Sequence, residues 1–538
     1  MVNISKPNAI APSHTAASAA YDEVTYDSKP FSQTNPLLLQ GIGRLFGLTA
    51  SSPYNARILE IGCATGTNIL AIASLYPNSR CVGIDYSQRQ IEIGQKEMEQ
   101  RGITNLELKH MSVMDLTPDF GSFDYIICHG VMSWVPKEVQ DKIFEVCKLN
   151  LSANGIAYIS YNTSPGWKLM DIVRDMILYH TSPYDDPTTK VQQARQALSF
   201  IGEAMRESAN PMAAVIDREI KRITPLPDYY LLHEYLTGVN TPWYFHEFVT
   251  HANSYGLQYL ADTELDVMFS ANLPAAVAKS LPPSKDFIQT QQYMDFVCNR
   301  SFRSTLLCHN TCALTLQVSP EILREGWLLC KFGYPQDFNK HDIKSGQTVQ
   351  FRLSMSNMAM TSSDPILLAM LQVFMEQGSF VRVADLAGYV RTKLNKIQQP
   401  FNEASLKTTL LVNALRYVFT RGLLFYMEKP QCVRAVSQHP MVSSLARYQS
   451  LHQDWVTNLL MELFVNVPAF DKILMRYADG TRTLDALSHA MLPHYVSGEL
   501  VFSENSSIIK DMNVLKRKMP MLVAHALQRF AEISLLVS

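Results

Sequence analysis

The sequence contains no long hydrophobic run and no excess of either charge. No stretch of about 18 or more apolar residues occurs in its 538 residues, so we expect no transmembrane segment. Lys and Arg total 47 against 49 Asp and Glu, for a formal net charge of −2. The chain as a whole therefore has no electrostatic attraction to nucleic acid or to an anionic membrane, and we expect no nucleic-acid partner. Residues 1–20 have polar residues and Pro7 but no apolar segment, and predict a disordered arm rather than a targeting signal.

Cysteine is sparse, and its spacing does not fit a metal site. Nine cysteines, an odd number scattered along the chain, favour a reducing compartment over a disulfide framework, which predicts a cytoplasmic protein. The histidines of HEFVTH (246–251) are five residues apart, whereas a zinc-protease helix needs four. Cys308, His309, Cys312 and Cys330 contain no second CxxC pair, so no metal is predicted.

Short apolar runs alternate with helical segments between residues 57 and 162. The helical segments show the spacing of amphipathic helices and end at residues such as Pro77 and Gly102. This alternation predicts parallel βαβ units, hence an α/β fold with a Rossmann-like, doubly wound sheet. The predicted strands and their exit loops are RILEIG (57–62), CVGID (81–85), LELKHMSVMDL (106–116), FDYIICHGVMSWV (123–135) and GIAYISYN (155–162).

The loop after the first of these strands is the expected ligand cradle, because ligands of such sheets bind at the carboxyl ends of the strands. Gly62 and Gly66 allow a tight turn and a close approach of the backbone. A dinucleotide fingerprint requires G-x-G-x-x-G, but Ala64 and Thr67 occupy its second and last glycine positions. The pattern Glu-x-Gly-x-Ala-x-Gly, starting at Glu60, instead resembles the first motif of class I S-adenosylmethionine-dependent methyltransferases, whose loop holds the methionine end of the cofactor.

Further marks stand at the ends of the next strands. Asp85 ends the second strand, where a carboxylate can accept hydrogen bonds from both ribose hydroxyls. Asp115, after the third, resembles the acidic residue that binds the adenine amino group. His129 and Gly130 follow the fourth strand, where methyltransferases contact the sulfonium and its methyl group. Each of these residues has a plainer interpretation as well. The glycines can form a simple tight turn and Asp85 can be a solvated loop residue. Asp115 can cap a turn, and His129 can be a buried, hydrogen-bonded histidine.

Longer phrases carry a more specific resemblance. YDEVTYDSKPFSQTNP (21–36), HGVMSWVP (129–136), SYNTSPGW (160–167), HEYLTGVNTPWYFHEF (233–248) and QYMDFVCNRSFRSTLLCH (292–309) together resemble bacterial class I methyltransferases with a methyltransferase regulatory region. Among these are rickettsial protein-lysine methyltransferases that modify an outer-membrane protein. The resemblance implies a helical insertion that serves dimerisation, hence a homodimer, and an arm that closes over the cofactor. With the arm included, the expected cofactor-binding residues are Tyr26, Phe31, Glu60, Gly62, Ala64, Gly66, Asn68, Asp85, Tyr86, Ser87, Met114, Asp115, His129 and Gly130.

The expected reaction is transfer of a methyl group from S-adenosylmethionine to a protein lysine. Direct displacement requires alignment of nucleophile, methyl carbon and sulfur, and a lysine must be neutral, which desolvation favours. We predict that Tyr161, Asn162, Trp134 and Trp167 form the acceptor channel; ordinary packing is the alternative. No Asn-Pro-Pro-Tyr or Asp-Pro-Pro-Tyr motif follows the fourth strand, which argues against bases or glutamine as acceptors. A small-molecule O- or N-methyltransferase and a cofactor-binding scaffold without catalysis remain the alternatives.

We expect additional domains in the rest of the chain, because 538 residues are more than a single hydrophobic core usually accommodates. ALTLQVS and TVQFRLSM suggest a small strand-rich middle domain. Three helices followed by the strand pair LFYMEK and CVRAV are winged-helix-like. The third helix has few Lys or Arg, so a protein-contact or packing role is favoured over DNA binding. The expected boundaries are an arm or lid (1–40), the methyltransferase core (41–172 and 241–283), a helical insertion (173–240), the middle domain (284–360), the winged-helix-like domain (361–436) and a helical C-terminal region (437–538).

Overall fold

A seven-stranded sheet organises the N-terminal half of the computed structural model, which describes residues 28–333, 348–353, 359–378, 380–501, 503–504, 507–508 and 511–538. The strand order is β3-β2-β1-β4-β5-β7-β6. The first five strands run parallel, and β7 is antiparallel to both of its neighbours. This arrangement confirms the predicted Rossmann-like α/β fold. The strands are β1 (Arg57–Ile61), β2 (Arg80–Asp85), β3 (Leu106–His110), β4 (Phe123–Cys128), β5 (Leu151–Asn162), β6 (Leu257–Asp262) and β7 (Phe302–His309).

Helices cover both faces of this sheet because each strand presents apolar side chains on both sides. Apolar residues of α2, α3 and α4 join one buried cluster with side chains from one face of the sheet. Those of α5 and α10 join a second cluster with side chains of the other face. The bounds are α2 (Pro36–Leu45), α3 (Thr67–Leu75), α4 (Gln88–Gln100), α5 (Lys137–Asn150) and α10 (Phe245–Ser254).

The sheet takes its seventh strand from beyond the predicted end of the core. β7 lies between β5 and β6, although we expected the core to end at residue 283 and residues 284–360 to form a separate domain. Two helices, α11 (Ala275–Ser280) and α12 (Phe287–Cys298), come between β6 and β7. The prediction of a strand at ALTLQVS (313–319) is wrong, because this segment is an irregular connection.

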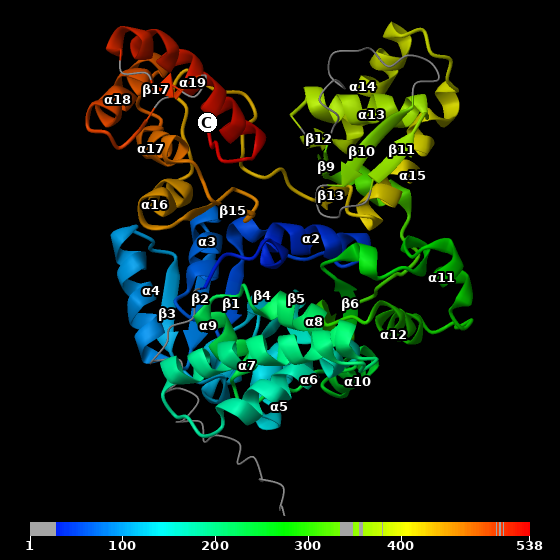
Figure 1. Cartoon of the computed structure of the whole chain (residues 1–538). Helices are drawn as coiled ribbons and strands as arrows, with labels where there is room; N and C mark the ends of the chain where they lie inside the picture. The colour runs from blue at the N-terminus through cyan, green and yellow to red at the C-terminus, as the bar shows by residue number, and fades with distance from the viewer. Residues whose placement is uncertain are drawn as a thin grey trace, which may run out of the picture.

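An all-helical insertion follows β5, and its helices lie along the front of the sheet in Figure 1. Apolar residues such as Val173, Leu198 and Ile220 form a core that belongs to the insertion itself. The last of its segments is a π-helical turn that returns the chain toward the sheet. The insertion consists of α6 (Ser164–Thr181), α7 (Pro187–Glu207), α8 (Ala213–Ile223), α9 (Asp228–Tyr230) and the π-helical turn η6 (Leu231–Tyr235).

Two further lobes lie above the sheet in Figure 1. In the first, the three predicted helices form, but the predicted hairpin does not, because residues 432–436 have no strand. The strand β13 pairs instead with β8, which precedes the helices in the chain, giving the sheet β12-β8-β13. The elements are η9 (Pro320–Glu325), β8 (Trp327–Cys330), β9 (Phe332–Gly333), β10 (Val349–Leu353), β11 (Ala359–Ser362), α13 (Pro365–Glu376), β12 (Phe380–Arg382), α14 (Val383–Lys396), α15 (Glu403–Phe419) and β13 (Leu423–Tyr426).

The second lobe is the C-terminal region, which contains two short antiparallel strand pairs in addition to the predicted helices. Its core is separate from the other three buried clusters. No helix in the described part of the chain is both long and apolar enough to cross a membrane. The elements are α16 (Ser444–His452), β14 (Trp455–Thr457), β15 (Leu463–Val465), α17 (Ala469–Tyr477), α18 (Leu484–Val496), β16 (Ser503–Glu504), β17 (Ser507–Ile508) and α19 (Met512–Glu532).

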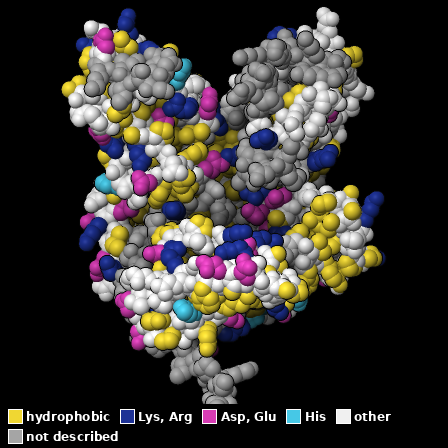
Figure 2. All heavy atoms as spheres, in the orientation of Figure 1, with side chains coloured by type: hydrophobic (Ala, Val, Ile, Leu, Met, Phe, Trp, Pro, Cys, Tyr) yellow, Lys and Arg dark blue, Asp and Glu magenta, His cyan; other side chains and the backbone are white. Residues whose placement is uncertain are grey.

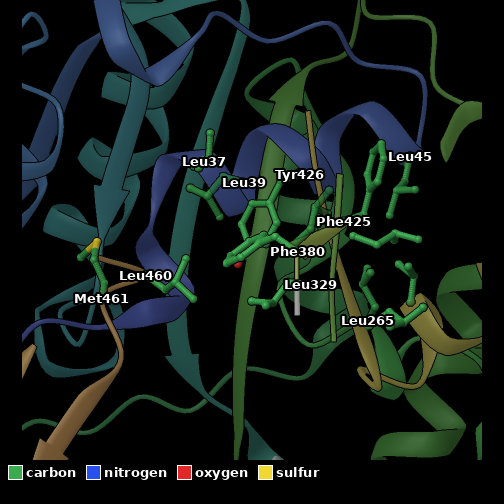
Figure 3. Packing of buried hydrophobic residues seen from close by; sticks show 14 of the residues in the cluster. Leu37, Leu39, Leu45, Leu265, Leu329, Phe380, Phe425, Tyr426, Leu460 and Met461 are labelled. Carbon is green, nitrogen blue, oxygen red and sulfur yellow. The ribbon is translucent and has the colours of Figure 1, made fainter. Parts of the chain in front are cut away.

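Helix α2 connects the seven-stranded sheet to both lobes. Leu37 and Leu39 on this helix lie near Tyr426 of β13, and Leu460 of the C-terminal region belongs to the same buried cluster (Figure 3). The helix approaches β13 so closely that a Cβ atom on Gly41 would lie 2.2 Å from the carbonyl oxygen of Phe425. Only glycine allows this approach, so α2 packs directly against the backbone of β13.

Candidate active site

A cavity of about 550 Å³ opens at the carboxyl edge of the sheet. The parallel strands β1, β2, β4 and β5 all end there. Because β7 runs antiparallel to β5, its first residue, Phe302, pairs with the last residue of β5, Asn162, at the same edge. The two sides of the cavity are therefore built from different parts of the chain. The ends of β1 to β4 form one side, and β5, β7 and the insertion form the other, together with Trp134 from the turn after β4.

The first side, which we call the cofactor half, is shaped by the turn between β1 and α3. Gly62, Ala64 and Gly66 all have positive φ angles of 69°, 51° and 76°, which explains the glycines at two of these positions. Asp85 at the end of β2 holds this turn in place: its carboxylate accepts hydrogen bonds from the backbone N–H of Ala64 (2.8 Å) and of Ser87 (2.8 Å). Of the residues expected here, Gly62, Ala64, Asp85, Tyr86 and Ser87 line the cavity, whereas Gly66 does not.

Glu60 is a buried carboxylate with one oxygen left over. Its side chain is 4% exposed, and the Nδ2 of Asn68 donates a hydrogen bond to Oε1 (2.8 Å). Among the described residues, Oε2 has no hydrogen-bond partner. Burial raises the pKa of Glu60 to about 8. A buried, unpartnered carboxylate oxygen beside a cavity fits the cationic group of a ligand.

Asn68 acts behind the cavity rather than in its lining. Its Oδ1 accepts hydrogen bonds from the backbone N–H of Phe31 (2.9 Å) and from the hydroxyl of Thr34 (3.1 Å). The arm is thereby fixed against the start of α3, and the ring of Phe31 reaches the cavity. Tyr26, the other residue predicted in the arm, lies outside the described residues.

His129 and Gly130 lie between the two halves, at the end of β4. The ring of Phe31 packs on that of His129, with 3.9 Å between their centroids. Nδ1 of His129 lies 2.9 Å from the hydroxyl of Tyr158, and burial lowers the pKa of His129 to about 4, so its imidazole is neutral near pH 7. Gly130 donates its N–H to the hydroxyl of Ser160 (2.8 Å). We did not predict Tyr158, although it lies on the same side of β5 as Ser160 by the two-residue period of a strand.

The second side, which we call the acceptor half, is lined mainly by aromatic rings. Trp134 meets Trp167 edge to face, with 5.7 Å between centroids, and Trp167 packs against Tyr235 at 6.2 Å. Asn162 also lines it and donates its amide to the side-chain oxygen of Asn240 (3.0 Å). Three of the four predicted acceptor residues are therefore brought together.

Tyr161 is the exception, because successive residues of a strand point to opposite faces. Its ring stacks on Phe248 of α10, with 3.9 Å between centroids, and its hydroxyl lies 3.1 Å from that of Thr305. It is buried in the core on the far side of β5 and does not line the cavity. The structure therefore contradicts its placement in the acceptor channel.

The two residues that we expected near the adenine lie outside the cavity lining. Met114 and Asp115 belong to the short helix η3 (Val113–Asp115), and both are exposed outside the cavity lining. The chain turns directly after β3, so Met111 and Ser112, together with Val113, line the cavity in their place. The carboxylate of Asp115 is therefore exposed and is not part of the cavity lining.

The lining residues of the acceptor half that sequence reasoning missed come from distant segments. They share no local motif with the loop after β1, because the insertion and β7 follow it by more than 100 residues. Only the phrases 160–167, 233–248 and 292–309 marked their neighbourhood. The missed lining residues of the acceptor half include Met170, Arg222, Tyr230, His233, Glu234, Tyr235, Ser301 and Phe302.

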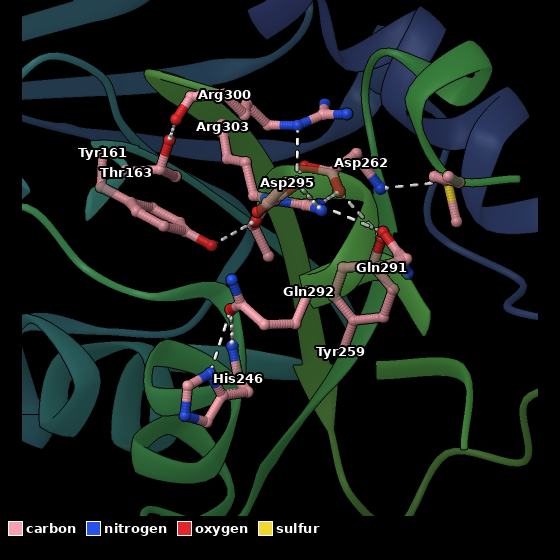
Figure 4. A network of polar contacts seen from close by, with 12 residues as sticks. Tyr161, Thr163, His246, Tyr259, Asp262, Gln291, Gln292, Asp295, Arg300 and Arg303 are labelled. Atoms are coloured by element: carbon pink, nitrogen blue, oxygen red, sulfur yellow. Dashed lines mark hydrogen bonds and ion pairs between the residues drawn. The ribbon is translucent and has the colours of Figure 1, made fainter. Parts of the chain in front are cut away.

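Phe302 is held by a buried polar network next to it in β7 (Figure 4). Arg303 donates two hydrogen bonds to Asp295 of α12 (2.8 and 2.9 Å) and forms an ion pair with Asp262 of β6. Arg300 contributes a second ion pair to Asp295 (2.7 Å). All three elements are thereby tied together at the edge of the sheet where the cavity opens. No group of three or more His, Cys, Asp or Glu side chains with the geometry of a metal site occurs among the residues that the structure describes.

Comparison with known families assigns three segments of the chain. A methyltransferase domain matches residues 58–155, and a predicted methyltransferase regulatory domain matches residues 227–309. The model of the PKMT C-terminal winged helix domain matches residues 438–535. The winged-helix match therefore lies in the C-terminal region, for which we predicted only helices, and not in residues 361–436.

Whole-chain relatives extend these matches. The uncharacterized protein RP789 of Rickettsia prowazekii is 37% identical over 524 residues, covering 96% of this chain and 93% of the relative. The structure of PKMT2 from Rickettsia typhi is 34% identical, with a TM-score of 0.86, and covers 95% of this chain and 100% of PKMT2. PKMT2 in complex with AdoHcy matches with a TM-score of 0.84. With its sheet order, its cavity and these matches, the chain belongs to the family of class I S-adenosylmethionine-dependent methyltransferases that carry a methyltransferase regulatory domain and a PKMT winged helix domain.

Proposed function

We propose that this methyltransferase transfers the methyl group to lysine side chains of a protein. The observation that carries the proposal is the aromatic acceptor half, which adjoins the cofactor half in one cavity. Rings of Trp134, Trp167 and Tyr235 can pack on the aliphatic stem of a lysine and keep water from its amine. The similarity to PKMT2 from Rickettsia typhi, together with the resemblance to rickettsial protein-lysine methyltransferases, supports the same acceptor class.

The cofactor half offers groups for each end of S-adenosylmethionine. In this proposal, Oε2 of Glu60 faces the ammonium group of the methionine end, and Asp85 faces the ribose. Residues 111–113 bound the space for the adenine. When bound, the cofactor supplies an electrophilic methyl group on a sulfonium leaving group. The chain itself supplies orientation, and the neutral imidazole of His129 avoids a repelling positive charge near the sulfonium.

Methyl transfer to an amine needs a neutral nucleophile in line with the methyl group. Removal of water by the aromatic rings lowers the pKa of a lysine amine, because the charged form is the one that loses solvation. The side-chain oxygen of Asn162, whose amide is engaged by Asn240, is left to accept a hydrogen bond from the amine.

The test is methyl transfer from labelled S-adenosylmethionine to bacterial membrane-protein extract and, separately, to a pool of small molecules. We expect label in protein, recovered as methyl-lysine after acid hydrolysis. The variant Trp167→Ala, which opens the aromatic wall, should lose most of this label while retaining affinity for S-adenosylhomocysteine. Label confined to small molecules would establish the alternative acceptor class, and cofactor binding without any label would establish a scaffold.

We also propose a homodimer formed through the insertion and located in a reducing compartment such as the cytoplasm. Tyr179 of α6 and Phe200 of α7 are 85% and 53% exposed, which supports burial of this surface by a second copy. All nine cysteines are free thiols, which supports the reducing compartment. Sedimentation of the full chain and of a Phe200→Glu variant tests the dimer: the variant should be monomeric.

A further inference from the structure

The cavity contains three carboxylates, and two of them belong to the cofactor half. Glu60 and Asp85 stand at the ends of β1 and β2. The third, Glu234, lines the acceptor half from the side of the insertion. It lies in the same turn as Tyr235, whose ring packs on Trp167. A single carboxylate among aromatic rings is a specific feature, because a charge in such surroundings is costly unless a cation offsets it.

The backbone around Glu234 is a π-helical turn, Leu231–Tyr235. Single π-helical turns are rare and occur frequently at functional sites. Leu231 of this turn is buried in the core of the insertion, whereas His233, Glu234 and Tyr235 all line the cavity. The wider turn thus brings three consecutive side chains to the cavity while its first residue anchors it.

Arg222, the cation whose charge acts on Glu234, is already engaged elsewhere. Arg222 donates a hydrogen bond from Nε to Glu219 (3.0 Å) and another from its guanidinium to the hydroxyl of Tyr235. Within the described residues, no hydrogen bond or ion pair involves the side chain of Glu234. Burial raises the pKa of Glu234 to about 7, while the charge of Arg222 opposes this shift. Other charged or titratable side chains on the elements packed around the turn include Lys168, Asp171, Arg174 and Asp175 on α6, Lys190 and Arg195 on α7, and Asp228, Tyr229 and Tyr230 on α9.

We propose that Glu234 binds the ammonium group of the acceptor lysine and takes its proton before methyl transfer. The proposal rests on the proposed function and adds the residue that recognises the substrate's charge. The carboxylate receives one proton from the ammonium, and the resulting neutral amine directs its lone pair at the methyl carbon. The new C–N bond forms as the C–S bond breaks, and the electron pair of that bond stays on sulfur. Glu234 then releases its proton to solvent.

The first experiment measures binding of n-butylamine, a mimic of the lysine side chain, to the full chain saturated with S-adenosylhomocysteine. We expect Glu234→Gln to weaken this binding about tenfold or more while the affinity for S-adenosylhomocysteine is unchanged. Glu234→Asp, which keeps a carboxylate, should restore part of the binding. Glu203→Gln, on the exposed side of α7, is the matched control and should bind like the wild type. Equal butylamine binding by wild type and Glu234→Gln, or none by the wild type, overturns the proposal.

The second experiment records the pH profile of lysine methylation in membrane-protein extract. The wild-type rate should rise up to about pH 7 and then level off, because Glu234 must be ionised. Without this carboxylate, the rate of Glu234→Gln should be lower and should keep rising about tenfold per pH unit to pH 9, since free lysine has a pKa of about 10.4. Identical pH profiles for the wild type and Glu234→Gln would overturn the role of Glu234 but leave the proposed function intact. Absence of methyl-lysine from the wild-type reaction would overturn the proposed function itself.

Discussion

Glu60 offers the sharpest test of the cofactor half, because its environment predicts a coupled change of charge on binding. Its pKa of about 8 in the free protein leaves about nine in ten molecules protonated at pH 7. If Oε2 faces the cofactor's ammonium group, binding requires the ionised carboxylate. Binding at pH 7 therefore releases about 0.9 proton, and the dissociation constant falls about ninefold between pH 6 and pH 7. Glu60→Gln keeps the shape and the acceptor for Asn68 but has no proton to release.

Isothermal titration with S-adenosylhomocysteine in two buffers of different ionisation enthalpy measures this proton release directly. We expect this proton release for the wild type and almost none for Glu60→Gln. The affinity of the variant for S-adenosylhomocysteine should be on the order of tenfold lower than that of the wild type at pH 7.5, and it should not change between pH 6 and pH 7. Glu107→Gln, at an exposed position of β3, is the control and should behave like the wild type. Equal proton release by Glu60→Gln and wild type, or a wild-type affinity that is flat from pH 6 to 7, would refute the reasoning.

The same substitution should have the opposite effect on the stability of the cofactor-free protein. The pKa of Glu60 is raised on folding, from an ordinary value of 4.5 to about 8, so ionisation disfavours the folded state. The protonated carboxyl group of Glu60 therefore contributes fully to the stability of the folded state below pH 4.5, and this contribution is lost as the pH rises through 8. At pH 8, Glu60→Gln should therefore be more stable than the wild type by on the order of 4 kcal/mol, and near pH 4.5 the two should be alike. Thermal unfolding at both pH values measures the difference.

Other parts of the structure give three further predictions. Asp85→Ala removes the acceptor of two backbone N–H groups and should weaken S-adenosylhomocysteine binding at least about 100-fold by calorimetry; unchanged binding contradicts the assignment. Gly41→Ala should lower stability by about 1–3 kcal/mol, because its Cβ would overlap the backbone of Phe425. Gly388→Ala, where nothing lies within 4 Å of the added Cβ, should raise stability by about 0.5–1 kcal/mol. Shifts of equal sign for the two variants in thermal unfolding would contradict the docking of α2. Arg303→Met leaves the buried Asp262 without its ion-pair partner and Asp295 with Arg300 alone, and should cost about 3–5 kcal/mol in chemical denaturation. A neutral result would show that the network contributes nothing.

The methyltransferase core could be predicted from the sequence because its determinants are local. A strand, a turn with positive φ angles and a helix follow each other within about twenty residues around Gly62, and Asp85 ends the next strand. The parallel order of the strands then brings these ends to one edge of the sheet without any further information. The same logic failed at Asp115, since the chain turns after Met111 and the periodicity of a strand does not report where it ends.

By itself, the sequence determined the α/β core, the methyl donor and the acidic and glycine residues of the cofactor half. Only the tertiary structure decided which residues form the acceptor half. Tyr161 and Asn162 are neighbours in the chain, yet one stacks on Phe248 and the other lines the cavity, because a strand alternates its faces. Glu234 and Phe302 reach the cavity from segments more than 140 residues beyond Asp85, through a π-helical turn and an antiparallel strand. Contacts of that range follow from packing, which no local pattern of residues encodes.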